Sequence, residues 1–485
     1  MALPSIKKNF AYSMLYQMLE IIVPFITAPY LARVLGADMV GVESYTNSVQ
    51  AYFLLFAALG TQSYGAREIS RSRDDIKQYS KLFWEIELMS IATSAAALAA
   101  WILLIGLSST YRIFYLVMIP SILGSMLNIT WFFNGLEKFK LTVIRNMLFR
   151  LAGVVFLFIF VREKSDVVIH VVILSLINLF SSVSLWIYIP KLTVKTQFRE
   201  LTIARHFKQT LTYFIPTIAT SVYTVLDKTL IGLITKSNTQ NGFYEQAENV
   251  MRVANRLSYS GINAVVGVRI SYLFVENKIE EIHARIENSM HYIFFMGMGC
   301  ACGLSAIAKR FVPLYFGPGY EGVEYLMYVL SPVSVIVGVS NCMGSHYYTP
   351  SGRRTQSSKY LIAGSCVNLV MNLCLIPYLQ AIGAAIATVI AESTISLLYV
   401  RNSNNYMNLK LLIQIGWKKF LSGIVMFAIV FQVGNLLKMT GIMVILVQIC
   451  LGIGVYVLGL YCLRDHWTIQ CIGKVLGRIT GKIKC

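Results

Sequence analysis

Six polar side chains recur at three- and four-residue steps between residues 245 and 259. A helix would place them on one face, because residues three and four apart are neighbours on its surface. They are Glu245, Glu248, Arg252, Asn255, Arg256 and Tyr259. Arg252 and Arg256 are one turn apart, so their forked guanidinium donors could grip one phosphate or diphosphate group. Glu248 is placed to pair with Arg252. The alternative is an internal salt-bridge ladder within a helical bundle.

Further ionisable residues occur inside apolar runs. An ionisable side chain near the centre of a bilayer costs roughly 2.5–3.5 kcal/mol, so it normally faces a partner, a cavity or water. Asp227 and Glu20 are therefore candidates for binding H⁺ or Na⁺, and Lys228 is a candidate for contacting phosphate. Asp227 and Lys228 point about 100° apart on a helix, so at most one of them faces a given partner. Pairing with another helix is the alternative for each residue.

The composition indicates the kind of element that must position these residues. Hydrophobic residues make up 56% of the 485 and charged residues 13%, whereas soluble domains are about 45–50% apolar and about 25% charged. A net charge of +19 could indicate nucleic-acid binding. However, the 42 Lys and Arg are spread in short clusters between apolar runs, which is the pattern of membrane topology signals. We therefore expect an all-α integral membrane protein and no nucleic-acid partner.

Fourteen apolar runs approach or exceed the roughly 18 residues that a membrane helix needs. They lie at about 10–35, 41–66, 82–107, 113–135, 143–161, 167–190, 211–235, 243–268, 288–308, 323–346, 360–377, 382–400, 420–437 and 441–463. Most Lys and Arg fall on one side when the N-terminus is cytoplasmic. An even number of crossings then places both termini on the cytoplasmic side of a bacterial plasma membrane.

Short similarities suggest an internal repeat, which is common in transporters. Gly41 with Glu43 and Tyr45 resembles Gly242 with Tyr244 and Glu245 after a preceding helix. Two pseudo-symmetric six-helix bundles would then enclose a central cleft. We expect an N-terminal lobe at 1–208, a C-terminal lobe at 209–402, and two additional helices with a basic tail at 403–485.

No enzyme motif is present in the sequence. It contains no Walker A segment, no HExxH, no GxSxG and no His or Cys cluster with metal-ligand spacing. We therefore expect no catalytic residues, no metal site and no cofactor. Any uphill transport would depend on an ion gradient, the membrane potential or removal of the product.

Several segments resemble bacterial polysaccharide exporters of the Wzx type, within the multidrug/oligosaccharidyl-lipid/polysaccharide (MOP) flippase superfamily. They are KKNFAYSMLYQMLEIIVPFITAPYLARVLGADMVGVESY, GAREISRSRDD, LDKTLIG with GFYEQAENV, and FGPGYEGVEYLMYVLSP. The resemblance covers nearly the whole chain, in the same order. It implies two bundles around a cavity, as in MATE transporters, and alternating access between the two membrane faces.

The resemblance also implies the cargo, a polyprenyl-diphosphate-linked oligosaccharide that is a precursor of capsule, exopolysaccharide or teichoic acid. Partners would be the bilayer and polysaccharide polymerase or assembly proteins. Cationic cavity residues of the family correspond to Lys228, Arg252 and Arg256, with Arg33 a weaker candidate. Lipid II flippases carry clustered arginines in their first two helices, a pattern that this chain lacks. A MATE-type drug or cation antiporter and a membrane-embedded glycan polymerase or transferase are the competing functions.

Overall fold

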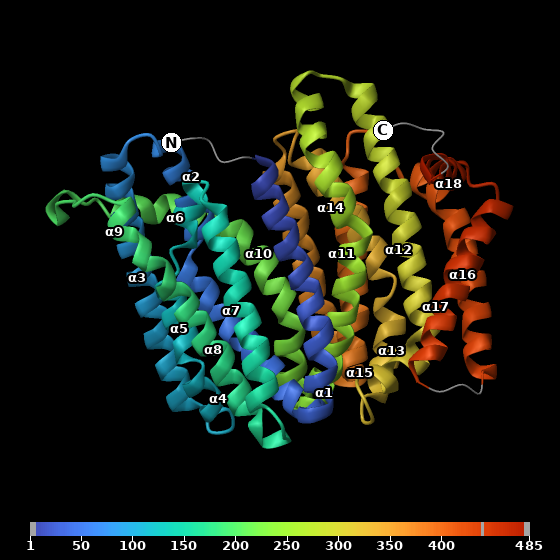
Figure 1. The fold of residues 1–485 in the computed structure, drawn as a ribbon, viewed down its shortest axis with the longest axis horizontal. Helices are drawn as coiled ribbons and strands as arrows, with labels where there is room; N and C mark the ends of the chain where they lie inside the picture. Colours follow the sequence, from blue (N-terminus) through green and yellow to red (C-terminus); the bar gives the residue numbers. More distant parts are fainter. Residues whose placement is uncertain (1–5, 438–440, 480–485) are drawn as a thin grey trace. The chain divides into compact units, whose positions relative to one another are not determined.

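The computed structural model describes residues 6–437 and 441–479, and every regular element in those ranges is helical. By contacts the chain forms two compact units, Met1–Gly242 and Phe243–Cys485, which are described separately below (Figure 1). The boundary lies just inside a helix. The predicted boundary between lobes at residue 208 stays a prediction, because clustering by contacts does not show which helices move together during transport.

The N-terminal unit contains ten α-helices and the start of an eleventh (Figure 1). They are α1 (Ile6–Ala58), α2 (Thr61–Ser72), α3 (Ile76–Leu107), α4 (Arg112–Val117), α5 (Ile119–Met126), α6 (Thr130–Gly135), α7 (Phe139–Phe160), α8 (Val167–Ser184), α9 (Ile189–Leu192), α10 (Ala204–Thr235) and the beginning of α11 (Asn238–Val275). Short 3₁₀ turns occupy η1 (Lys164–Asp166), η2 (Leu185–Tyr188) and η3 (Phe198–Glu200).

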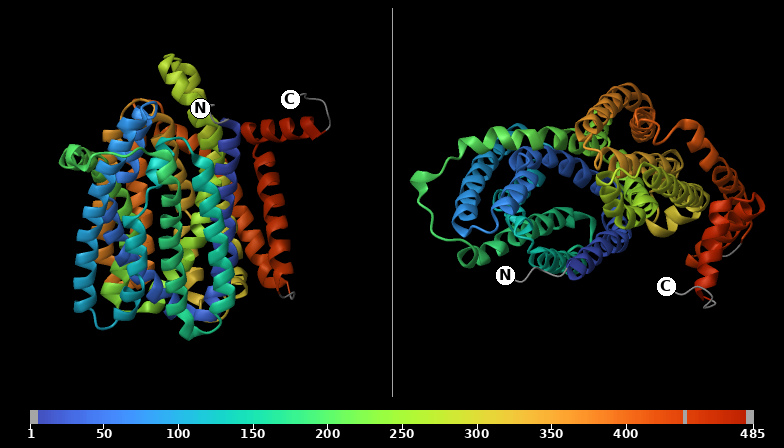
Figure 2. Two further views of the ribbon diagram at one scale, coloured as in Figure 1. Left: turned by 60° about the vertical axis from the view of Figure 1, so that its left-hand side comes forward. Right: turned by 90° about the horizontal axis from the view of Figure 1, so that it is seen from above.

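The C-terminal unit contains the remainder of α11 and seven further α-helices. They are α12 (Ile279–Tyr315), α13 (Glu321–Leu330), α14 (Val333–Met343), α15 (Arg354–Arg401), α16 (Leu409–Leu436), α17 (Ile442–Cys462) and α18 (His466–Ile479), with a π-helical turn, η4, at Gly344–Tyr348. Figure 2 shows α18 lying across the end of α17.

Two of the long helices each contain a sharp break. Gly36 in α1 has φ 75° and Gln380 in α15 has φ 53°, both in the left-handed region where a continuous helix cannot pass. Glycine adopts this conformation without penalty at residue 36. The loops expected between runs 10–35 and 41–66, and between 360–377 and 382–400, are therefore reduced to single breaks.

Other expected runs are interrupted in the structure. The run 41–66 is divided at Leu59 and Gly60, with φ 41° and 76°, so its last part belongs to α2. The run 113–135 is divided among α4, α5 and α6. Nine helices of the described residues are long and apolar enough to cross a membrane, or ten if α13 and α14, bent by 42°, form one span. The chain is thus an all-helical protein with multiple candidate membrane spans.

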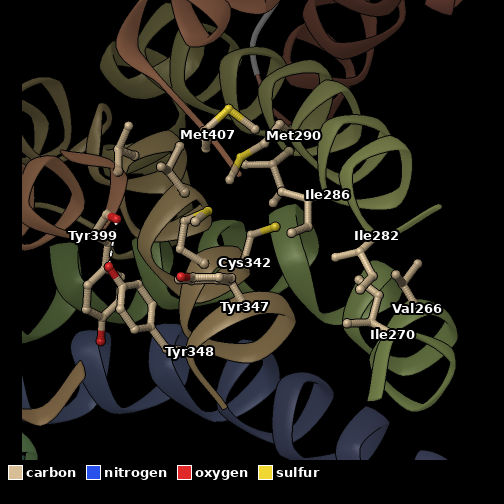
Figure 3. Close-up of a cluster of buried hydrophobic side chains, with 14 of the residues drawn as sticks. Val266, Ile270, Ile282, Ile286, Met290, Cys342, Tyr347, Tyr348, Tyr399 and Met407 are labelled. Carbon is tan, nitrogen blue, oxygen red and sulfur yellow. Dashed lines mark hydrogen bonds between the residues drawn. The ribbon is translucent and has the colours of Figure 1, made fainter. Parts of the chain in front are cut away.

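Each unit has its own apolar cores. In the N-terminal unit Phe83, Trp131 and Phe132 are fully buried and packed ring to ring. In the C-terminal unit, Figure 3 shows a cluster in which Tyr348 donates a hydrogen bond of 2.9 Å to the Tyr399 carbonyl. These cores fix the helices that carry the polar residues described next.

A buried ion pair fixes the start of α18 in the C-terminal unit. Lys419 of α16 is fully buried, and its Nζ donates to Asp465 Oδ2 at 2.9 Å and to the Ile415 carbonyl at 3.1 Å. Asp465 also caps α18 by accepting hydrogen bonds from the Thr468 backbone N–H and Oγ1. The turn between α17 and α18 therefore depends on a charge inside α16.

Candidate functional site

The predicted polar face of α11 forms within the C-terminal unit. Arg252 Nη2 lies 3.1 Å from Glu248 Oε2, so the expected pair is confirmed. The side chains of Arg252 and Glu248 are 48% and 29% exposed, which leaves the guanidinium accessible. Tyr259 lies within electrostatic reach of Arg256. Glu245 accepts a hydrogen bond from Asn249, and Asn255 is partly buried.

Asp227 and Lys228 lie on α10, in the N-terminal unit. Asp227 is buried, with 6% of its surface exposed. The next residue but one, Thr229, bonds Tyr52 at 3.1 Å and Ser48 at 2.9 Å, both on the second leg of α1. These contacts fasten α10 to α1. The Lys228 carbonyl accepts a hydrogen bond of 2.8 Å from Asn241.

Glu20 and Arg33 lie on the first leg of α1 and are not brought together. Arg33 is exposed. Glu20 Oε1 lies 3.7 Å from Arg150 Nη1 of α7, and both side chains are 30% exposed. Glu20 is therefore an ion-paired residue, whereas the sequence suggested a lone carboxylate among apolar residues.

A cavity of about 690 Å³ lies inside the N-terminal unit, beside that ion pair. It is bounded by α1, α7 and α8, by the start of α2, and by the segment that leads into α6. Its apolar lining includes Val23, Leu31, Leu157 and Leu174. Its polar lining comprises Thr27, Gln62, Asn128, Thr130, Arg145, Asn146, Arg150, His170, Asn178, Ser181 and Ser182. The described lining thus contains two arginines and no carboxylate.

Arg145 is held in place by neutral oxygen atoms. Its Nε and Nη2 donate to Asn146 Oδ1 at 3.0 and 2.5 Å, its Nη2 also reaches Thr130 Oγ1 at 3.3 Å, and its Nη1 reaches the Ser181 carbonyl at 3.2 Å. These contacts orient the guanidinium. A positive group fixed beside amides and hydroxyls can bind an anion that also carries hydroxyl groups.

The sequence analysis did not select these two arginines, although both lie within the expected apolar run 143–161. In the structure α7 begins at Phe139, so Arg145 and Arg150 lie about 9 Å and about 16 Å along the helix. The detectable signal is Arg145, Asn146 and Arg150 together with Asn178, Ser181 and Ser182 on the neighbouring α8.

Glu43 of α1 forms an ion pair inside the N-terminal unit. Its side chain is only 13% exposed, and its Oε2 lies 2.9 Å from His170 Nδ1. His170 is itself buried, so this contact lies inside the bundle. The pair joins the second leg of α1 to α8 at the edge of the cavity.

A second cavity, of about 550 Å³, lies inside the C-terminal unit. It is bounded by α12, by α13 and α14 near their junction, and by α16. Its lining is mainly apolar and consists of Met298, Ala301, Cys302, Ser305, Tyr328, Ser331, Pro332, Val335, Ile336, Phe420, Ile424, Phe427 and Phe431. None of these side chains carries a formal charge.

Comparison with known proteins identifies a matching family and relatives that cover up to 82% of the chain. A family model described as a polysaccharide biosynthesis protein matches residues 6–267. A putative O-antigen transporter of Escherichia coli is 26% identical over 413 residues, covering 82% of this chain and 97% of that protein. A probable low-salt glycan biosynthesis flippase, Agl15, of Haloferax volcanii is 21% identical over 236 residues, covering 48% of this chain and 49% of that protein.

Two solved structures show the fold. The lipid II flippase MurJ, in an inward closed conformation, matches with a TM-score of 0.76 at 14% identity, over 94% of this chain and 99% of that one. An inward-facing multidrug resistance MATE family transporter of the MOP superfamily matches with a TM-score of 0.53 at 12% identity, over 84% and 98%. The chain therefore has a MurJ- and MATE-like fold.

Proposed function

Since the chain belongs to the polysaccharide biosynthesis protein family, we propose that it is a flippase for a polyprenyl-diphosphate-linked oligosaccharide. The cargo is a precursor of capsule, exopolysaccharide or teichoic acid, moved from the inner to the outer leaflet of a bacterial plasma membrane by alternating access. The chain crosses the membrane fourteen times with both termini in the cytoplasm. In this topology α1 and α15 each cross twice, at the breaks at Gly36 and Gln380, and α10 and α11 each cross once.

The cavity of the N-terminal unit is the observation that carries this proposal. A diphosphate with sugars cannot cross hydrocarbon alone, because its polar groups lose water without replacement. Arg145 and Arg150 offer charge for the anionic group, and the neighbouring amides and hydroxyls replace water around sugar hydroxyls. At about 690 Å³ the cavity is within the range of small-ligand sites, roughly 300–1,000 Å³.

The α11 face remains part of the proposal. Arg252, Arg256 and Lys228 are proposed to contact the diphosphate, with Arg33 a weaker contributor, while Glu245, Glu248, Asn255 and Tyr259 support the two arginines. The pairing of Arg252 with Glu248 supports this assignment, since the same guanidinium can exchange a carboxylate for a phosphate. Asp227 and Glu20 are proposed to couple transport to H⁺ or Na⁺.

The test uses purified protein in liposomes loaded with a fluorescent polyprenyl-diphosphate oligosaccharide. An external glycan-cleaving enzyme measures how much of the cargo becomes exposed. Arg145→Gln with Arg150→Gln should reduce exposure at least about tenfold, since each lost charge-assisted hydrogen bond is worth roughly 1.5–3 kcal/mol. Arg252→Gln with Arg256→Gln should do the same.

The matched control is Arg112→Gln, which removes an exposed arginine of the same unit outside the cavity lining. Its transport should equal that of the wild type. Absence of protein-dependent exposure, together with ion-driven efflux of an organic cation, would replace the flippase by a drug antiporter.

A further inference from the structure

Helix α3 carries two glutamates, Glu85 and Glu87, which have opposite surroundings. Both are fully buried, with 0% of their surface exposed. Two residues along a helix correspond to a turn of about 200°, so the side chains point to nearly opposite sides. Neither carboxyl group belongs to the lining of the cavity described above.

Glu85 is saturated with hydrogen-bond donors. Its Oε2 lies 2.6 Å from Arg205 Nη2 and 2.8 Å from His206 Nε2. Its Oε1 accepts bonds of 2.8 and 3.0 Å from the backbone N–H and the hydroxyl of Thr202. A carboxylate with these partners keeps its negative charge inside the bundle.

Glu87 has no such partners. Neither of its carboxyl oxygens makes a hydrogen bond to any group in the described part of the chain. The indole of Trp131 is the polar group turned towards it, yet the Trp131 N–H also fails to reach hydrogen-bond geometry. Phe83, one turn earlier on α3, stacks on Trp131 at 5.8 Å, so the environment is aromatic.

The charged groups on the helices packed against α3 are committed elsewhere or exposed. On α1, Asp38 pairs with Lys164 and Glu43 with His170. On α2, Glu68 pairs with Arg71, and Arg67 contacts the Tyr213 hydroxyl. The remaining groups on α1, α4 and α10 whose side chains the structure describes are also accounted for. Glu20 is paired with Arg150, while Arg33, Arg112 and Lys208 are exposed. Arg205 and His206 both contact Glu85, Asp227 lies near Tyr52, and its neighbour Lys228 is half-buried on α10. Helices α5 and α6 contain no Asp, Glu, Lys, Arg or His.

A negative charge on Glu87 would therefore be buried without compensation. Such a charge is far more costly than a buried neutral carboxyl group, so the group is held in its protonated form. A methionine or leucine would fill the same space at lower cost, because even the neutral carboxyl group lacks a hydrogen-bond partner. A carboxyl group retained at such a position is typical of proton relays in membrane proteins.

We propose that Glu87 is a proton-binding site that couples glycan transport to proton movement. Its carboxyl group holds one proton in this conformation and releases it to water when the N-terminal bundle rearranges, then takes up one proton from the opposite side. Buried Ser90 and Ser94, at one-turn steps on the same face of α3, offer hydroxyl groups towards the far end of the helix. The coupling rests on the proposed flippase function, whereas proton binding does not.

Proton binding is tested on the unaltered protein with dicyclohexylcarbodiimide, which reacts with protonated carboxyl groups in apolar surroundings. Glu85 is an internal control, since it is equally buried and ionised. Fragment mass spectrometry should locate the adduct on Glu87 and not on Glu85, and labelling should fall as pH rises. Labelling of Glu85 with none on Glu87 would overturn the proposal.

Coupling is tested by the ratio of flipping rates in liposomes with and without an imposed pH gradient. Wild-type protein should give a ratio of at least about three, and Glu87→Gln should give a ratio of one. Glu137→Gln, an exposed glutamate near the start of α7, should keep the wild-type ratio. A gradient-independent wild type, or a Glu87→Gln variant that retains the ratio, would refute coupling even if Glu87 is labelled. Loss of flipping under both conditions in the wild type would instead refute the flippase.

Discussion

The two internal cavities differ in chemistry more than in size. The N-terminal one, about 690 Å³, is lined by two arginines, amides and hydroxyls. The C-terminal one, about 550 Å³, is lined mainly by aromatic and aliphatic side chains. The first cavity can replace the hydration of an anionic, hydroxylated group, whereas the second, with few polar groups, favours an apolar ligand.

Two units that are both built from helices can therefore enclose cavities of different polarity. Phe420, Ile424, Phe427 and Phe431 of the C-terminal cavity come from α16, which has no counterpart in the predicted six-helix repeat. The added helix supplies one apolar wall. The N-terminal cavity receives its arginines from α7, which lies within the predicted repeat.

The difference in chemistry between the two cavities is tested most directly by placing one carboxylate in each of them. Asn178→Asp should leave the protein folded, because the N-terminal cavity is polar, but should reduce transport at least about tenfold by repelling an anionic cargo. Cys302→Asp should reduce the free energy of unfolding by about 2.5–3.5 kcal/mol, because the charge meets no partner. Flipping assays and thermal unfolding in detergent measure the two effects.

The neutral variants Asn178→Ala and Cys302→Ser are the controls, and each should lose much less than the corresponding Asp variant. Equal transport by Asn178→Asp and wild type would mean that the N-terminal cavity does not meet an anion.

A second change concerns the buried charge of the C-terminal unit. Lys419→Met leaves Asp465 buried without its cation and should reduce the free energy of unfolding by about 3–5 kcal/mol. Adding Asp465→Asn should restore much of the loss, since asparagine can still accept from the Thr468 N–H while carrying no charge. Chemical denaturation should show the wild type as the most stable, the double variant next and the single variant Lys419→Met as the least stable. A single variant as stable as the double would contradict this order.

The same pair predicts a pH dependence. Burial by itself raises the pKa of the Asp465 carboxyl group, but hydrogen bonds from Lys419 and Thr468 outweigh burial and hold that pKa below its usual value. The stabilisation is therefore present above the unfolded pKa, about 3.9, and is lost as pH falls through the folded pKa. The stability difference between wild type and the Lys419→Met/Asp465→Asn variant should be constant from about pH 5 to 8 and shrink below about pH 4.

The smallest expected effects come from one tyrosine in each unit. Tyr30 donates to the Val161 carbonyl at 2.6 Å, and Tyr456 donates to the Phe295 carbonyl at 3.0 Å. Tyr30→Phe and Tyr456→Phe should each lower the free energy of unfolding by about 1 kcal/mol, because each removes one hydrogen bond and keeps the ring. A clearly larger loss at Tyr30 alone would show that the closure of α1 on α7 matters beyond a single bond.

Much of the fold is predictable from the sequence, because the hydropathy of a segment and the position of a glycine determine helices and helix breaks locally. The apolar runs identified the helices, and the run 10–35 ended just before Gly36, where the backbone turns. The interruptions at Leu59 and between α4, α5 and α6 were not predictable, since no local signal separates a bent span from a straight one. Packing of Trp131 against Gly65, whose absent Cβ allows the contact, decides part of that path.

The site was harder to predict, because burial depends on partners far away in sequence. Arg145, Arg150 and Lys419 were not selected from the sequence, yet they lie inside helices whose neighbours supply oxygen atoms. Glu87 lies inside the expected run 82–107 but was not selected, and its lack of hydrogen-bond partners is visible only in the structure. By contrast the Glu248–Arg252 pair is local, and helical spacing sufficed to predict it.

The two glycines on which the internal repeat was aligned pack against each other. A Cβ atom on Gly41 would lie 2.9 Å from the Gly242 backbone N, and one on Gly242 would lie 1.9 Å from the Ala37 carbonyl oxygen, so neither position has room for a side chain. If the predicted repeat holds, the same requirement for a residue without a side chain occurs at equivalent positions of its two copies.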